Sequence, residues 1–67
     1  PYHYSDWLGS LSFDDLQRLR KVVRLVHMKN YPKRQITNRE MDRIIEAIGP
    51  RVAEQQLKAL IDAGKLN

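Results

Sequence analysis

The sequence contains no cysteine. This absence excludes disulfide bonds, thiol catalysis and every zinc site that depends on cysteine. Only two histidines are present, and His3 and His27 lie far apart in the chain. The three glycines are scattered, so they cannot build the glycine-rich loop that cradles phosphate groups in nucleotide-binding enzymes. We therefore expect no enzyme, no metal site and no cofactor.

Long apolar stretches are also missing. No run of apolar residues approaches the roughly 20 that a membrane-spanning helix needs. The first residues are too polar for a secretory signal. We expect a cytoplasmic protein that does not enter a membrane. Because the first residue is Pro1 and not Met, we also expect a fragment or a processed product.

The composition is that of a small globular domain. The 67 residues suffice for one domain, and 42% of them are hydrophobic while 30% are charged. This balance is typical of a folded chain rather than a disordered one. No alternating apolar and polar pattern indicates strands, so residues 1–67 are expected to form a single helical domain.

A first helix is predicted over residues 12–30. Ser12 and Asp15 have the spacing of a capping box, in which the first side chain accepts a backbone N–H from the second residue. Apolar residues then recur with the 3.6-residue period of one helix face. Pro32 disfavours helical geometry at the residue before it, so the helix should end near Asn30.

A second helix is predicted over residues 37–48. Thr37 and Glu40 form a T-x-x-E capping box at its start. The dipeptide Gly-Pro that follows ends this helix and begins the next, because glycine favours the position after a helix and proline the first helical position. The third helix is predicted over residues 50–63.

The expected architecture is an all-α, small three-helix bundle. The aromatic N-terminal segment, residues 1–11, should pack on the bundle, and Asp6 can cap a short helical turn containing Trp7 and Leu8. Periodicity assigns the core positions to one face of each helix. The predicted core is Trp7, Leu11, Leu16, Leu19, Val23, Val26, Ile36, Met41, Ile44, Ile45, Ile48, Ala53, Leu57, Leu60 and Ile61.

The second and third predicted helices have the outline of a helix-turn-helix, since a short glycine-containing turn joins them. In that motif the N-terminal residues of the last helix face the base edges. Its outward face holds three candidates for base readout, Arg51, Gln55 and Lys58. The end of this helix, Gly64 followed by Leu66, resembles the helical part of a winged-helix domain, in which a strand comes next. The alternative is an ordinary helix pair in a bundle.

Positive charge is concentrated in one region. Residues 13–35 carry seven basic side chains and two acidic ones, whereas residues 36–67 carry five of each. Such a cluster favours contact with nucleic-acid phosphates or another polyanion. The candidate contacts are Arg20, Arg24, Lys29, Lys33 and Arg34. The alternative is a solvated face that complements the helix C-terminus.

Four apolar residues fall outside the predicted core faces. They are Leu25 and Met28 in the first helix and Val52 and Ala59 in the third. Apolar groups on an outer face indicate a partner helix or self-association. The alternative is that the N-terminal aromatic segment covers Leu25 and Met28.

Two further features are expected to be structurally ordinary. The carboxylates Glu40, Asp42 and Glu46 alternate with arginines at the spacing of helical ion pairs, which predicts a solvated face. His27 lies near a helix end and is expected to be a capping or surface residue. The leading hypothesis is a helix-turn-helix-like nucleic-acid-binding module, and the second is a protein-interaction or assembly domain.

Overall fold

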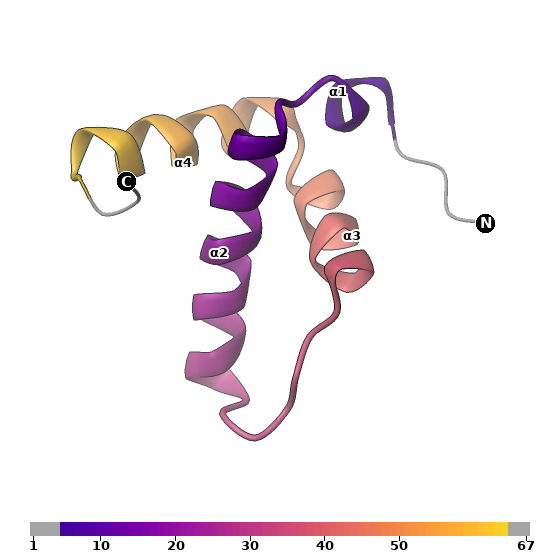
Figure 1. Ribbon diagram of the computed structural model, residues 1–67, viewed down its shortest axis with the longest axis vertical. Helices are drawn as coiled ribbons and strands as arrows, with labels where there is room; N and C mark the ends of the chain where they lie inside the picture. Colours follow the sequence, from indigo (N-terminus) through magenta and orange to yellow (C-terminus); the bar gives the residue numbers. More distant parts are fainter. Residues whose placement is uncertain (1–4, 65–67) are drawn as a thin grey trace.

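The computed structural model describes residues 5–64. Within them the chain forms only helices, arranged as in Figure 1: α1 (Asp6–Gly9), α2 (Phe13–Asn30), α3 (Asn38–Ile48) and α4 (Pro50–Asp62). The predicted all-α class is confirmed, and α1 is the short N-terminal turn. The expected capping by Asp6 is wrong, because Ser5 occupies the N-cap position and Asp6 lies inside the first turn. The first four residues of the predicted aromatic segment, and Leu66, lie outside the described residues.

The helix starts follow the predicted capping chemistry. The Ser12 hydroxyl accepts the Asp15 backbone N–H at 3.1 Å. The box at α3 is reciprocal, because Thr37 Oγ1 accepts the Glu40 N–H at 3.2 Å while Glu40 Oε1 accepts the Thr37 N–H at 3.4 Å. These bonds satisfy N–H groups that have no partner inside a first helical turn. Local sequence therefore defines where both helices begin.

Gly49 alone connects α3 to α4. Its N–H donates to the Ile45 carbonyl at 3.2 Å, and its carbonyl accepts the Ala53 N–H at 3.1 Å. The residue thus ends one helix and begins the next. Its φ of 89° and ψ of 164° lie in a region open essentially only to glycine. At this point the chain changes direction, and α4 runs across the α2–α3 pair (Figure 1).

The core lies where α1, α2, α3 and α4 meet. α2 and α3 lie side by side, and α4 crosses them near the N-terminal end of α2, next to α1 (Figure 1). The most buried apolar side chains are Leu8, Leu19, Val23, Met41, Ile45 and Ala53. Packed against them and partly buried are Trp7, Leu11, Leu16, Ile36 and Leu57. Leu8 was missing from the predicted core, because a four-residue helix carries no periodicity to read.

Four residues of the predicted core are exposed instead. Val26, Ile44, Ile48 and Ile61 retain 56%, 42%, 39% and 53% of their accessible surface. The molecule is flat, with a shortest principal extent of 17 Å against 35 and 32 Å along the other two axes. In so flat an arrangement, parts of each helix are covered on one side only. Apolar positions at the edge of each helical stripe therefore have no helix above them.

A backbone hydrogen bond ties the start of α1 to α3. The Ser5 N–H donates to Glu46 Oε2 at 2.8 Å. Glu46 is half-buried, so the expectation of a solvated carboxylate at this position is wrong. The contact explains why the segment before α2 returns to the bundle: it places Trp7 and Leu8 over the end of the core.

Replacing Gly49 with alanine should destabilise the fold. A residue with a Cβ at this φ and ψ costs on the order of 1–3 kcal/mol, although the space around Gly49 is open. Urea denaturation followed by helical circular dichroism should show a fall of about that size in the free energy of unfolding. Gly9→Ala is the matched control, because Gly9 is equally open but has no positive φ. Equal effects of the two substitutions would contradict this account.

Candidate functional site

Arg20 and Asp42 form a buried ion pair between α2 and α3. Arg20 Nε donates to Asp42 Oδ1 and an Arg20 terminal nitrogen donates to Oδ2, each at 2.7 Å. The Asp42 side chain is 0% exposed and that of Arg20 12% exposed. Two parallel bonds to one carboxylate are the strongest geometry available to an arginine. This pair is a structural link between the two helices.

Two sequence-based expectations are corrected by this pair. Asp42 does not belong to a solvated face, because no part of it reaches solvent. Arg20 does not belong to an open cationic surface, because its guanidinium faces Asp42. Both residues flank an apolar stripe, Arg20 beside Val23 and Asp42 beside Ile45, when placed at 100° intervals. In the sequence, the signal for a buried ion pair was a pair of opposite charges, one at the border of each of the two apolar helix faces that pack together.

Two more arginines of the basic region have carboxylate partners nearby. Arg18 contacts Asp15 at 2.8 Å, with both side chains about one-third exposed. Arg34 contacts Glu40 at 3.3 Å, with exposures of 65% and 41%. Surface pairs of this kind contribute about 0–1 kcal/mol and exchange readily with other partners. Arg34 therefore remains accessible to an anion, whereas Arg20 does not.

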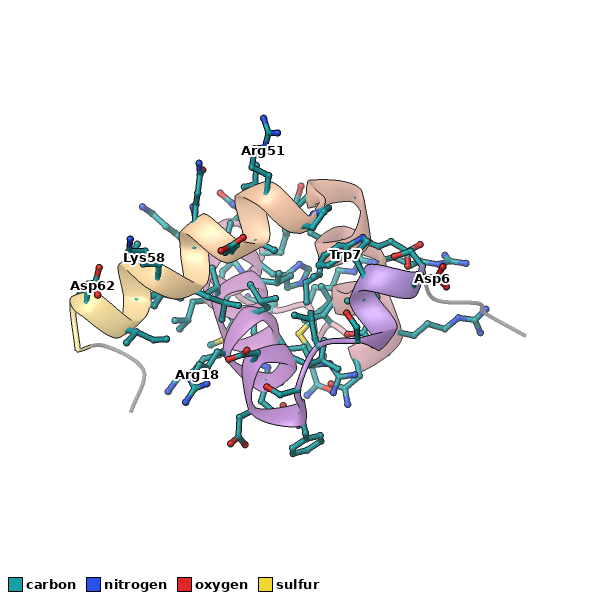
Figure 2. The ribbon with its side chains drawn as sticks, turned by 90° about the horizontal axis from the view of Figure 1, so that it is seen from above. Asp6, Trp7, Arg18, Arg51, Lys58 and Asp62 are labelled. Atoms are coloured by element: carbon teal, nitrogen blue, oxygen red, sulfur yellow. The ribbon has the colours of Figure 1, made fainter. Side chains whose placement is uncertain are left out.

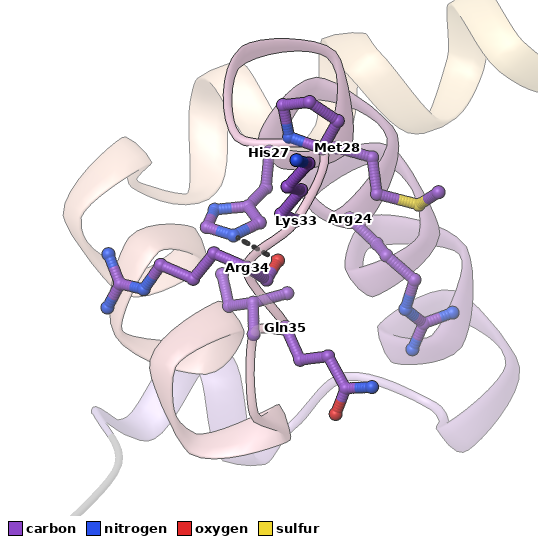
Figure 3. A pocket seen from close by; sticks show the side chains of 8 residues that line it. Arg24, His27, Met28, Lys33, Arg34 and Gln35 are labelled. Carbon is purple, nitrogen blue, oxygen red and sulfur yellow. Dashed lines mark hydrogen bonds between the residues drawn. The ribbon is translucent and has the colours of Figure 1, made fainter.

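The remaining basic candidates gather at the C-terminal end of α2. A surface hollow of about 470 Å³ lies between this end and the loop before α3 (Figure 3). It is lined by Arg24, His27, Met28, Pro32, Lys33, Arg34, Gln35 and Ile36. Three of the five predicted phosphate contacts thus share one site, which we call the cationic hollow. Lys29, the fifth, is exposed in the last turn of the same helix.

The loop that carries Lys33 is held by short-range bonds. The Arg34 N–H donates to the Tyr31 carbonyl at 3.1 Å, closing a four-residue turn with Pro32 at its favoured second position. His27 Nε2 lies 3.0 Å from the Arg34 carbonyl oxygen (Figure 3). Because a carbonyl only accepts, this nitrogen carries the proton. His27 is thus a bridge from helix to loop: its ring contacts a loop carbonyl rather than a carbonyl of the last turn of α2, so the bond does not cap the helix.

The three predicted base readers lie elsewhere. Arg51, Gln55 and Lys58 are exposed on the outer face of α4, and Arg51 points away from the other helices (Figure 2). α4 lies across the N-terminal half of α2, whereas the cationic hollow lies at the opposite end (Figure 1). α2 is 18 residues long, or about 27 Å at 1.5 Å per residue. The structure therefore does not bring the predicted base readers and phosphate contacts together.

The junction between α3 and α4 is shorter than that of a typical helix-turn-helix. One residue, Gly49, separates the two helices, where the motif commonly has a turn of three or four. The outline of two successive helices with a glycine between them is present. Within residues 5–64, the three- or four-residue turn that sets the standard recognition geometry is absent.

The four apolar interface candidates are all on the surface. Leu25, Met28 and Val52 are 56%, 52% and 42% exposed, and Ala59 is exposed as well. Leu25 and Met28 lie in the half of α2 that extends beyond α4, away from Trp7 at the other end (Figures 1 and 2). The described part of the N-terminal segment therefore does not cover them, which was the alternative.

Comparisons with known proteins add no family to this description. No family model, no curated protein and no solved structure matches the chain. Within residues 5–64, no group of three or more histidine, aspartate or glutamate side chains is placed to hold a metal ion. None of the described helices is both long enough and apolar enough to cross a bilayer.

Removing Asp42 should cost far more stability than removing a surface partner. Asp42→Ala removes the carboxylate that accepts two Arg20 hydrogen bonds, and breaking a buried pair from one side costs about 3–5 kcal/mol. Arg18→Gln, which breaks the half-exposed pair with Asp15, should cost under about 1 kcal/mol. Urea denaturation of both variants measures the difference.

A double variant separates pairing from general damage at the same positions. Arg20→Leu with Asp42→Leu removes both charges and keeps apolar volume between the helices, which is often nearly neutral. We expect the double variant to retain helical circular dichroism even where Asp42→Ala has lost it. A double variant as unstable as Asp42→Ala would show that the cost does not come from an unpaired charge.

Proposed function

We propose that this protein binds nucleic acid through phosphate contacts at the C-terminal end of α2 and the following loop. The observation that carries the proposal is the cationic hollow, which brings Arg24, Lys33 and Arg34 to one site. Within the described chain neither Arg24 nor Lys33 has a carboxylate within ion-pair distance, and Arg34 has only a 3.3 Å surface contact. Lys29 is a further exposed charge in the last turn of α2, outside the lining of the hollow.

The spacing of these charges favours a chain of phosphates over one small anion. The Arg24 and Arg34 side chains extend in opposite directions from the hollow (Figure 3). They therefore do not enclose a single group, but successive phosphates of a polymer can meet both. Neutralising several phosphates releases condensed counterions, which gives affinity without sequence information.

Side chains rather than backbone amides would bind the phosphates. The site lies at the C-terminus of α2, where the helix dipole presents its negative end and disfavours an anion. The cationic side chains must outweigh that local field. Affinity should therefore depend strongly on each of the four basic residues, and Arg20, paired inside the fold, is not among them.

The salt dependence of binding tests this proposal. Anisotropy of a labelled random-sequence oligonucleotide, titrated between low and physiological salt, should give a linear fall of log affinity with log salt concentration. Each phosphate contact contributes roughly 0.7–0.9 to the slope. Arg24→Gln with Lys33→Gln should therefore reduce the slope by about 1.4–1.8.

The matched control removes the same amount of charge from α4. Arg51→Gln with Lys58→Gln changes two exposed basic residues far from the hollow. This variant should leave the slope nearly unchanged. Equal losses from the two pairs would mean that only net charge matters. No measurable binding of the parent protein at low salt would end the proposal.

A second candidate function is assembly through apolar surface. It is favoured by the nine large apolar side chains that are exposed within residues 5–64. They include the predicted interface residues Leu25, Met28 and Val52; Leu25 and Met28 are three residues apart on α2, and Met28 also lines the cationic hollow. Contiguous exposed apolar groups mark protein-interaction sites when they form a patch.

Self-association tests the assembly function. Sedimentation equilibrium at rising concentration should reveal dimers or larger species, and Leu25→Gln with Met28→Gln should shift them toward monomer. Phe13→Gln is the control, because Phe13 is 70% exposed at the other end of α2. A parent protein that stays monomeric at millimolar concentration would leave this function without support.

A further inference from the structure

One aromatic side chain stands beside the cationic hollow without being part of the core. Tyr31, the first residue after α2, is 57% exposed. Its N–H donates to the His27 carbonyl at 2.7 Å, and its own carbonyl accepts the Arg34 N–H at 3.1 Å. The backbone of Tyr31 is thus fixed from both sides. The ring is accessible, yet its position is defined.

The Tyr31 ring also has an aromatic neighbour. The His27 ring lies 5.3 Å away between centroids, with an angle of 38° between the planes. At this separation the two rings are in aromatic contact. His27 in turn is held by the Arg34 carbonyl at 3.0 Å. One side of the tyrosine is therefore supported, and the exposed remainder faces solvent.

A second, more open hollow surrounds Tyr31. It measures about 430 Å³ and is lined by Asn30, Tyr31, Pro32, Lys33 and Arg34. Three of these residues, Pro32, Lys33 and Arg34, also line the cationic hollow. Two neighbouring depressions thus share their basic residues. One depression adds an aromatic ring, and the other adds Arg24.

We propose that the nucleic acid bound at this site is single-stranded, with a base stacked on Tyr31 and its backbone passing along Lys33, Arg34 and Arg24. This inference rests on the proposed function. Proteins that bind single strands combine a basic track for the backbone with aromatic platforms for the bases. Both parts are present within a few residues of one loop.

Duplex DNA can make fewer contacts with this site than a single strand can. In a duplex the base faces are covered by their stacked neighbours, so Tyr31 would have only groove edges and phosphates to contact. A major groove is read by an inserted helix or two-stranded ribbon, and α4, which carries the predicted base readers, lies at the other end of the molecule (Figure 1). A protruding loop with one supported tyrosine fits an unpaired base instead.

The test compares one oligonucleotide as a single strand and as a duplex. We expect the parent protein to bind a labelled single-stranded pyrimidine 12-mer more tightly than the matching duplex at the same salt concentration. Stacking of one base on an aromatic ring contributes about 5- to 150-fold in affinity. Tyr31→Leu should therefore weaken single-strand binding by at least about fivefold and leave duplex binding nearly unchanged.

Two control variants isolate the stacking. Tyr31→Phe keeps the ring and should bind the single strand like the parent, whereas Tyr31→Leu keeps only apolar bulk. Arg24→Gln with Lys33→Gln should weaken both forms of nucleic acid. Since Tyr31 is exposed, helical circular dichroism and the melting temperature of the Tyr31 variants should match those of the parent.

The outcomes distinguish failure of this inference from failure of the proposed function. Equal binding of single strand and duplex, with Tyr31→Leu unchanged in both, overturns the single-strand assignment and leaves phosphate binding intact. Binding of neither nucleic acid at low salt overturns both proposals. Polyglutamate should not compete with the single strand at equal charge concentration; equal competition would show a site for any polyanion and overturn the stacking.

Discussion

The bond between Arg20 and Asp42 constrains the fold more than any other single contact described above. An aspartate with no exposed surface cannot remain charged without a partner, because moving an unpaired carboxylate out of water costs far more than the net stability of a small domain. Its two oxygens accept two arginine nitrogens at 2.7 Å. Such a pair requires one orientation of α3 against α2, whereas apolar contacts alone tolerate sliding.

The fixed orientation of α2 and α3 also fixes the two ends of the loop between them. Its start is fixed by the end of α2 and its finish by the capping box at Thr37. Once α2 and α3 are held by the ion pair, the intervening residues must span a set distance. The turn closed by Tyr31 and Arg34, and the bridge from His27, occupy that span. The basic residues of the loop are therefore displayed on a supported surface.

The hydrophobic core of this fold is small. Among the described residues, six apolar side chains are well buried, while nine large ones remain exposed. A domain of this length buries only roughly 60% of its unfolded surface even when packed closely. The flat shape, with a shortest principal extent of 17 Å, leaves still more of the surface in contact with solvent. Stability then depends on a few features whose loss would each be costly. They include the positive φ at Gly49, the Ser5–Glu46 hydrogen bond and the Arg20–Asp42 ion pair.

The sequence by itself determined the helices and their ends. Ser12, Thr37 and Gly49 act through bonds to residues at most four positions away, so their effect can be read without knowing the fold. The concentration of basic residues between positions 13 and 35 is likewise a property of the chain. Local chemistry of this kind predicted the all-α class and the loop that carries Lys33 and Arg34.

Only the tertiary structure decided which of those residues face solvent. Arg20 and Arg24 are one helical turn apart and chemically identical, yet the first lies against Asp42 and the second lines an open hollow. Val23 and Val26 follow the same stripe, yet one is 8% exposed and the other 56%. The difference arises from where α3 lies along α2 and where α4 crosses it. Periodicity assigns a residue to a helix face, but burial requires a second helix over that face, and this depends on contacts between distant parts of the chain.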